Sequence, residues 1–223
     1  MTLPRTPWTF TDGHTLDVGT LYCIGRNYAA HAAEMGAQVP SDPIVFLKPP
    51  AAVVAGDTAI DLPSWSADVH HEVELVVVLG TDLDNADPAA ALDAVAGYAV
   101  GLDLTARDVQ AGAKQRGEPW AVAKSWKGSA PVSHVVPRST SGDGPFEISL
   151  DVNGQRRQYG STAQMERSIA TLIAFCSRLF SLRAGDAIFT GTPQGVARLQ
   201  PGDAVALHLH GLIHAHFTCR SAP

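Results

Sequence analysis

Val69–Leu79, with the sequence VHHEVELVVVL, is the segment that decides the fold, and it carries the clearest strand pattern of the chain. Side chains alternate between the two faces of a strand, so Glu72 and Glu74 are expected to share one face. From residue 76 onward the run is wholly apolar, which is typical of a strand that is buried on both faces. We therefore expect a β-rich core built around this strand.

The two glutamates leave two interpretations open. Their spacing alone favours the solvent face of a half-exposed strand. The apolar continuation favours a buried position, where two like charges repel and lose hydration unless something compensates them. A divalent cation is one such compensation, and oxygen ligands favour Mg²⁺, Mn²⁺ or Ca²⁺ over Zn²⁺. Asp103 follows an apolar segment at 98–102 and is a candidate third ligand, with a helix cap as its alternative role.

The rest of the chain adds many short strands and few helices. Further strand patterns lie at 21–24, 44–48, 98–102, 146–152 and 156–159, the last two flanking a hairpin signal at Asn153-Gly154. Helix patterns lie at 28–35, 88–95 and 168–179. Residues 131–145 are rich in Ser, Gly and Pro and predict a surface loop. The fold class that follows is α+β, predominantly β.

Composition limits the class of protein. The chain has 223 residues, of which 45% are hydrophobic and 17% charged, as in ordinary folded domains. Its formal net charge of −6 argues against a general nucleic-acid binder. Residues 1–10 lack the apolar core of a signal peptide, and no apolar run reaches the length of a membrane-spanning helix. The three cysteines are scattered and lack metal-ligand spacing, which fits a reducing cytoplasm. Taken with the net charge and the lack of a membrane-spanning run, this leads us to expect a cytoplasmic protein that binds neither nucleic acid nor membrane.

Two groups of histidines could take part in chemistry. His31 and Glu34 are three residues apart and would share one face of a helix. A carboxylate that orients an imidazole is a common general-base arrangement, although most such pairs are plain surface contacts. Near the C-terminus, four histidines could share one face of a hairpin and bind zinc: His208, His210, His214 and His216. For these four we favour a solvent-facing row, with the leucines between them packed on the other face.

A series of short motifs follows in a characteristic order. They are Ile24-Gly25-Arg26-Asn27-Tyr28, His31-Ala32-Ala33-Glu34, Phe46-Leu47-Lys48-Pro49, His70-His71-Glu72-Val73-Glu74-Leu75, Gly101-Leu102-Asp103-Leu104-Thr105-Ala106-Arg107-Asp108, Gly117-Glu118-Pro119-Trp120, Ala123-Lys124-Ser125, Asn153-Gly154 with Arg157-Gln158, and Gly185-Asp186 with Thr190-Gly191-Thr192-Pro193. In these motifs the chain resembles the fumarylacetoacetate hydrolase family, closely its short single-domain acylpyruvate hydrolase branch. The resemblance implies a mixed β-sandwich roll with a few short helices, usually a homodimer. It also implies an extension of residues 1–18 packing on a catalytic domain of residues 19–223.

The resemblance implies a role for each candidate residue. Its Mg²⁺ or Mn²⁺ ligands would be Glu72, Glu74 and Asp103. His31 and Glu34 would be the water-activating dyad, on a lid over the substrate. The substrate would then meet Lys124 at its oxyanion and a pocket lined by Arg26, Arg107, Gln110 and Thr192. Lys48 lies in a motif near the site and would support Lys124 or the ligands.

The function implied by the resemblance is metal-dependent cleavage of the C3–C4 bond of acylpyruvates. These 2,4-diketo acids, such as fumarylpyruvate from the breakdown of aromatic compounds, would give pyruvate and a carboxylic acid. The same site could instead decarboxylate oxaloacetate or interconvert the keto and enol forms of 2-oxo dicarboxylates. The intact His31–Glu34 pair favours hydrolysis, because isomerisation has no evident need for a base that activates water. An inactive metal-binding scaffold would be expected to have lost the dyad, Lys124 or a ligand, and all are present.

Overall fold

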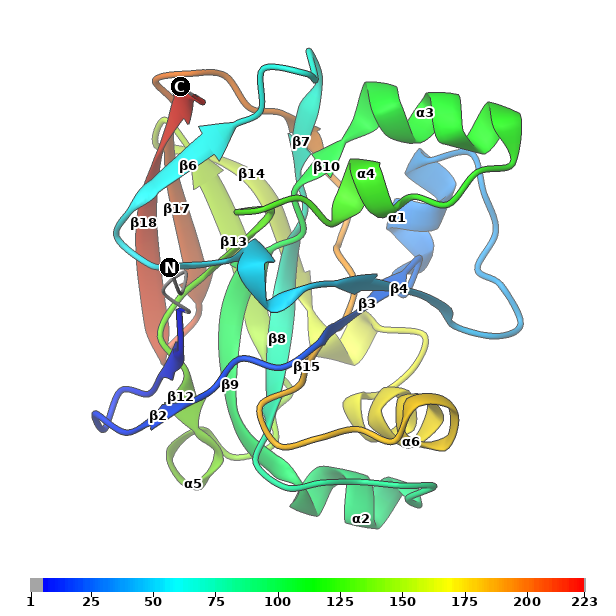
Figure 1. Ribbon diagram of the computed structural model, residues 1–223. Coiled ribbons are helices and arrows are strands. Elements are labelled where there is room, and N and C mark those ends of the chain that lie inside the picture. Colours follow the sequence, from blue (N-terminus) through cyan, green and yellow to red (C-terminus); the bar gives the residue numbers. More distant parts are fainter. Residues whose placement is uncertain (1–5, 223) are drawn as a thin grey trace, which may run out of the picture.

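Curled sheets with short helices at their ends make up the computed structural model, which describes residues 6–222 (Figure 1). Strands outnumber helices in this range, and its longest helix has 12 residues. The predicted class, α+β and predominantly β, is confirmed. Of the predicted N-terminal extension, residues 1–5 lie outside the described residues, and the boundary at residue 18 stays a prediction.

The largest sheet has eight strands, in the order β4-β3-β15-β8-β9-β11-β5 with β12 beside β9. Its members are β3 (Leu21–Gly25), β4 (Ile44–Lys48), β5 (Val53–Ala55), β8 (Val73–Leu79), β9 (Val95–Leu102), β11 (Ala130–Val132), β12 (Val136–Pro137) and β15 (Ala187–Phe189). β8 lies at the centre and pairs antiparallel with β9 and β15, whereas β3 and β15 pair in parallel. All seven residues of β8 are buried, as its apolar sequence predicted.

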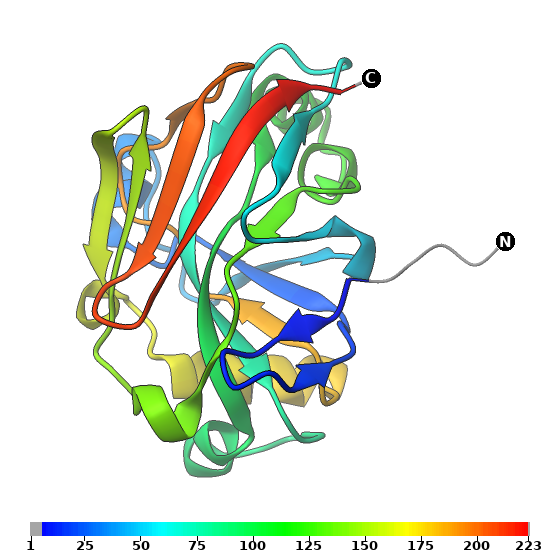
Figure 2. The ribbon, with the colours of Figure 1, turned by 90° about the vertical axis from the view of Figure 1, so that its left-hand side faces the viewer.

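A second sheet has five strands, in the order β14-β13-β17-β18-β6, and Figure 2 shows its β17–β18 hairpin toward the viewer. Its members are β6 (Ala59–Leu62), β13 (Glu147–Val152), β14 (Gln155–Ser161), β17 (Ala204–Leu209) and β18 (Ile213–Ser221). The predicted hairpin between β13 and β14 is confirmed, with Asn153 and Gly154 both at positive φ. Two small sheets complete the set: β7 (Val69–His71), β10 (Thr105–Ala106) and β16 (Ala197–Arg198) in one, and β1 (Trp8–Thr9) and β2 (Thr15–Leu16) in the other.

Alternate residues of β8 enter two different apolar clusters. Val73, Leu75, Val77 and Leu79 pack in the cluster that also holds residues of β13 and β17, between the two large sheets. Val76 and Val78 enter a second cluster on the opposite face, together with residues of β3 and β15. Glu72 and Glu74 have the parity of this second face, so the fold directs both carboxylates away from the five-stranded sheet.

The helices gather at opposite ends of the sheets, with α1, α3 and α4 at one end and α2 and α6 at the other (Figure 1). They are α1 (Ala29–Glu34), η1 (Pro50–Ala52), α2 (Pro88–Asp93), α3 (Arg107–Arg116), α4 (Ala121–Lys124), α5 (Arg138–Ser141), η2 (Thr162–Gln164) and α6 (Ile169–Phe180). The helix pattern at 88–95 is confirmed by α2, whose N-terminus is capped by the Asp87 carboxylate, which accepts the N–H groups of Ala89 and Ala90. None of the helices between residues 6 and 222 has the length and apolar character needed to cross a membrane.

Three expectations about local structure were wrong. The strand expected at 69–79 is interrupted at Glu72, because β7 pairs with β10 and β16 while β8 enters the large sheet. Much of the loop expected at 131–145 is buried and contributes to β11 and β12, whose prolines are tolerated because both strands are very short. The helix cap considered as the alternative role of Asp103 is not found, because the ten-residue helix α3 begins at Arg107 with Ala106 at its N-cap.

Candidate active site

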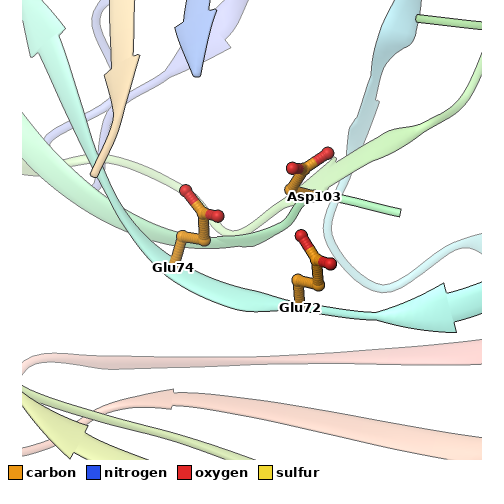
Figure 3. A group of neighbouring side chains, drawn as sticks. All are labelled: Glu72, Glu74 and Asp103. Carbon is orange, nitrogen blue, oxygen red and sulfur yellow. The ribbon is translucent and has the colours of Figure 1, made fainter. Parts of the chain in front are cut away.

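Three carboxylates from neighbouring strands point into the same space (Figure 3). Glu72 lies at the break between β7 and β8, Glu74 lies in β8, and Asp103 directly follows β9. Each offers an oxygen atom that lies within 4.8 Å of the others. Their exposed fractions are 5%, 2% and 1%. The solvent-facing interpretation of the glutamates is therefore wrong, and the structure brings together the three residues that the sequence singled out.

Strand register produces this convergence. Val73 pairs with Leu102 across β8 and β9, and the N–H of Asp103 donates to the carbonyl of Glu72 at 2.9 Å. Asp103 is thereby held beside Glu72 where the two strands separate. Glu74, two residues further along β8, faces the same side, and its Oε2 accepts the N–H of Gly191 at 2.8 Å. The pairing of β8 with β9 thus holds Glu72 and Asp103 side by side, and the Gly191 amide holds Glu74.

The three carboxylates differ in their electrostatic surroundings. Burial raises the pKa of Glu74, and the charges of Asp103 and Glu72 raise it further, well above its ordinary value. Burial acts the same way on Glu72, but the ammonium of Lys124 and the guanidinium of Arg107 outweigh it and lower the pKa of Glu72. Lys124 Nζ lies 2.8 Å from Glu72 Oε2 and also contacts Asp103 Oδ2. Positive charge therefore reaches Glu72 and Asp103 directly, whereas Glu74 accepts only a backbone amide among the described residues.

This distribution of charge fits a divalent cation. The set is made only of oxygen donors, which suits hard cations such as Mg²⁺ and Mn²⁺. Glu74 is buried among like charges and lacks a cationic partner in residues 6–222, so an added positive charge at this point would stabilise its ionised form. Glu72, Glu74 and Asp103 would hold such an ion, consistent with the sequence expectation.

Lys48, at the end of β4, supports this arrangement from behind. Its side chain is 0% exposed, and Nζ lies 2.9 Å from Asp103 Oδ1. The same ammonium donates to Ser129 Oγ at 3.0 Å, to the carbonyl of Ser129 at 3.1 Å and to the carbonyl of Lys124. One buried cation therefore ties together the segments that carry Asp103, Lys124 and Ser129. The sequence expectation that Lys48 supports Lys124 or the ligands agrees with these contacts.

The predicted dyad lies on α1, at the opening of the same cavity. His31 is 7% exposed and lines the cavity, and its Nδ1 lies 3.3 Å from Glu34 Oε2. Glu34 in turn accepts the N–H of Gly195 at 3.0 Å. The carboxylate is thus held between the imidazole and a backbone amide of a distant loop. With Glu34 at Nδ1, the other ring nitrogen is free to act on a ligand in the cavity.

A single cavity gathers nearly all of the predicted site residues. The predicted residues that line it are Arg26, His31, Glu72, Glu74, Asp103, Arg107, Gln110, Lys124 and Thr192. Glu34 is outside this lining and contacts it through His31. Several further residues line the cavity without having been candidates from the sequence, among them Met35, Ile44, Phe46, Lys114 and Trp120. Of these, Lys114 carried a usable signal, because it follows Arg107 and Gln110 at helical spacing.

Thr192 is positioned by a buried glutamine of the five-stranded sheet. Gln158 Nε2 donates to Thr192 Oγ1 at 2.9 Å, and Gln158 Oε1 accepts the N–H of Val73 at 3.1 Å. The same Oε1 lies 2.8 Å from His71 Nδ1. His70 instead lies 3.0 Å from Asp68. Within residues 6–222 neither histidine hydrogen-bonds to a glutamate, and Gln158 supports the site instead.

The four C-terminal histidines lie together on the outer face of the β17–β18 hairpin. His208 pairs with His214 across the hairpin, and adjacent rings along the row are 5.4 to 6.4 Å apart between centroids. His208 is half-buried, and the other three are exposed. In the described part of the chain they form no group of three convergent ligand atoms. The solvent-facing row that the sequence favoured is confirmed.

Known proteins resemble this chain both in sequence and in structure. Residues 20–219 match the family model described as fumarylacetoacetate (FAA) hydrolase C-terminal. Oxaloacetate tautomerase YcgM from Escherichia coli (strain K12) is 44% identical over 196 residues, which cover 87% of this chain and 90% of that one. The mitochondrial oxaloacetate tautomerase FAHD1 from Homo sapiens is 43% identical over 199 residues, with 88% and 90% covered.

A solved structure of high similarity is the fumarylpyruvate hydrolase from Pseudomonas aeruginosa, crystallised in complex with Mn²⁺ and pyruvate. It superposes on 99% of this chain and 99% of its own with a TM-score of 0.93 and 36% sequence identity. The similar proteins thus differ in the reaction for which they are named.

Proposed function

The chain belongs to the fumarylacetoacetate hydrolase family, and from this premise we propose that it cleaves the C3–C4 bond of acylpyruvates into pyruvate and a carboxylic acid. One observation carries the proposal: His31, with Glu34 at its Nδ1, lines the same cavity as Glu72, Glu74 and Asp103. A base that can activate water beside a cation site is the equipment that hydrolysis requires.

The cation would be Mg²⁺ or Mn²⁺, held by the three carboxylates. When bound, it would polarise the keto-acid oxygens and orient the substrate. The Mn²⁺ and pyruvate in the hydrolase from Pseudomonas aeruginosa support this choice of cation and product. Arg107 adds a binding group from this chain, since its Nε is buried without a hydrogen-bond partner in the described residues. A substrate carboxylate would satisfy that donor, with Gln110 and Thr192 also lining the cavity.

The chain's own residues would supply three functions in hydrolysis: proton abstraction, stabilisation of the enolate and return of the proton. His31 takes a proton from water, and the resulting hydroxyl adds to C4 of the substrate. The C3–C4 bond breaks, its electron pair stays on the pyruvate side as an enolate, and the acyl group leaves as a carboxylic acid. Lys124 is the cation placed to stabilise the enolate oxygen, and protonated His31 can return its proton to C3. Removing one preorganised donor to such a charge costs about 3–4 kcal/mol of transition-state stabilisation in other enzymes.

Oxaloacetate tautomerisation is the second candidate. The specific observation in its favour is that relatives at 43–44% identity carry this name, whereas the hydrolase structure is 36% identical. The reaction requires only proton transfer between C3 and the C2 oxygen, for which His31 is equally available. Decarboxylation of oxaloacetate would leave the same pyruvate enolate without an attacking water. The three reactions are thus alternatives on one site and are separated by their products.

The test is a product analysis on the purified protein and on His31→Ala. We expect Mg²⁺- or Mn²⁺-dependent release of pyruvate and an equimolar carboxylic acid from an acylpyruvate, abolished by EDTA. His31→Ala should lower turnover by roughly 10²- to 10⁴-fold, because a general base is lost, while Mn²⁺ binding measured by calorimetry is retained. His216→Ala, an exposed histidine of the C-terminal row, is the matched control.

Parallel assays with oxaloacetate measure CO₂ and the ultraviolet absorbance of the enol. Rapid loss of that absorbance, with no pyruvate from any acylpyruvate, would replace the hydrolase proposal with the tautomerase. Undiminished acylpyruvate cleavage in His31→Ala would remove the dyad from the mechanism.

A further inference from the structure

One face of α3 leads outward from the carboxylates. Arg107, Gln110 and Lys114 are spaced by three and four residues, so they share one face of the helix, and all three line the cavity. Arg107 contacts Glu72 at the inner end and donates to Gln110 Oε1 at 2.8 Å. Seven residues at 1.5 Å of rise separate the backbone of Lys114 from that of Arg107 by about 10 Å along the helix axis. Lys114 therefore marks a second position in the cavity, distant from the cation site.

Two cations that line this cavity lack partners within residues 6–222. Neither the Lys114 ammonium nor the Arg26 guanidinium makes a hydrogen bond or an ion pair with any residue between 6 and 222. Lys114 Nζ instead lies 5.2 Å from the ring centre of Trp120. Arg26, which follows β3, has a φ of 59°, in the left-handed region that costs a residue with a side chain about 1 kcal/mol or more. Conformational strain at a cavity-lining cation is a common mark of a binding role.

The charge around Lys114 is predominantly positive. Lys114 is exposed, yet partial desolvation of its ammonium lowers its pKa, and the nearby charges of Arg107, Arg26 and Lys124 lower it further. Glu72 acts in the opposite direction, but its own carboxylate is already in contact with Arg107 and Lys124. Crowded cations without a counter-charge repel one another, and a bound anion would relieve that repulsion.

We propose that Lys114 and Arg26 form a distal anion subsite that binds the terminal carboxylate of acylpyruvates whose acyl group is itself an acid. The inference rests on the proposed function, because the other end of the substrate must lie at the carboxylate triad. In a seven-carbon 2,4-dioxo diacid the terminal carboxylate is C7, whereas in oxaloacetate it is C4. A subsite further out along α3 suits the longer diacid. Phe46 and Trp120, with ring centroids 6.2 Å apart, offer aromatic surface to the carbon chain.

The experiment compares two acylpyruvates of equal length, one ending in a carboxylate and one in a methyl group. It uses the metal-loaded protein and the variants Lys114→Gln and Arg26→Gln. We expect each variant to lower kcat/KM for the acidic substrate by roughly 10- to 100-fold, mainly through KM, since a charge-assisted contact is lost. For the methyl-ended substrate the change should stay below about 2-fold. Arg116→Gln is the matched control, because Arg116 is on the same helix but outside the cavity lining, and it is paired with Glu118.

Several outcomes would overturn the subsite while leaving the proposed function intact. The wild-type protein would show no preference for the acidic substrate, or the variants would lose activity on both substrates equally. A change in the ratio of kcat/KM in favour of the methyl-ended substrate in Lys114→Glu would support the subsite further.

If the wild-type protein cleaves neither substrate, the proposed function fails and binding decides the subsite alone. Calorimetry with fumarate and crotonate compares a dicarboxylate with a monocarboxylate of the same length. Stronger binding of fumarate, lost in Lys114→Gln and kept in Arg116→Gln, would uphold the subsite. Equal binding of the two acids, or a fumarate preference unaffected by Lys114→Gln, would refute it.

Discussion

The carboxylate triad and the C-terminal histidine row are both sets of potential metal ligands, yet the structure treats them differently. Each begins with residues two apart in or beside a strand, such as Glu72 with Glu74 or His208 with His210. The triad takes its third member from a neighbouring strand and is buried, with its ligand atoms within 4.8 Å. The row stays on one hairpin, faces outward and satisfies its rings locally, as when His210 Nε2 lies 2.9 Å from Ser149 Oγ. Strand spacing therefore identifies candidates, whereas burial and an unbalanced charge distinguish a site.

The largest effect expected from this comparison follows from removing one charge of the triad. Asp103→Asn keeps the size of the side chain but removes a carboxylate from the set, and it leaves Lys48 and Lys124 without a shared counter-charge. We expect Mn²⁺ affinity, measured by calorimetry, to fall by at least about 100-fold, since loss of groups that only support a metal ligand already costs 10- to 100-fold. Wild-type Mn²⁺ affinity in Asp103→Asn, or its loss in His214→Asn, would reverse the comparison.

A substitution at Lys48 measures how strongly the buried charges around the triad contribute to the free energy of unfolding. Lys48→Met removes a fully buried cation and leaves Asp103 Oδ1 and three backbone carbonyls without it. Breaking a buried pair typically costs 3–5 kcal/mol, and we expect a loss of about that size in the free energy of unfolding by urea.

The control is Arg220→Met, which breaks the exposed pair between Arg220 and Asp61 and should cost less than about 1 kcal/mol. The double variant Lys48→Met/Asp103→Asn should be more stable than the sum of its single effects, because the two side chains are coupled. Strict additivity would mean that Lys48 acts only through the backbone carbonyls.

The smallest effect is expected on the histidine row. His214 is exposed and contacts its neighbours through ring packing, so His214→Ala should change the free energy of unfolding by no more than about 0.5 kcal/mol. The Mn²⁺ affinity of the triad should also be unchanged. Tight binding of Zn²⁺ by the wild-type protein in addition to the ion at the triad, lost in His214→Ala, would contradict this prediction. The histidine row would then be a metal site of its own.

The parts that sequence predicts well are those that depend on local patterns. The strand period expected at 69–79 placed Glu72 and Glu74 on one face, and Asn153-Gly154 marked a hairpin. The unpredicted parts depend on long-range contacts. Helix α3 has too few apolar residues for a periodic signal, although the structure ends it at Gly117, with φ of 68°.

Lys48 illustrates the same limit within the site. Its contacts reach Leu104, Lys124 and Ser129, which lie 56, 76 and 81 residues away. A spacing pattern carries no information about such distances, so the sequence could place Lys48 near the site only through a resemblance. The break of the strand at Glu72 has a similar origin, because it arises from the pairing of β7 with β10 and β16.

The three cysteines make the chain convenient for spectroscopic labelling. Cys23, Cys176 and Cys219 are all buried, and burial raises the pKa of Cys176 and Cys219 to about 12. Thiolate, the form that alkylating reagents attack, is therefore scarce at neutral pH in the folded protein. A cysteine introduced at Gln38, an exposed position after α1, would be the one readily alkylated thiol among residues 6–222. A fluorophore attached there would report on movement of the helix that carries His31, with the native cysteines left in place.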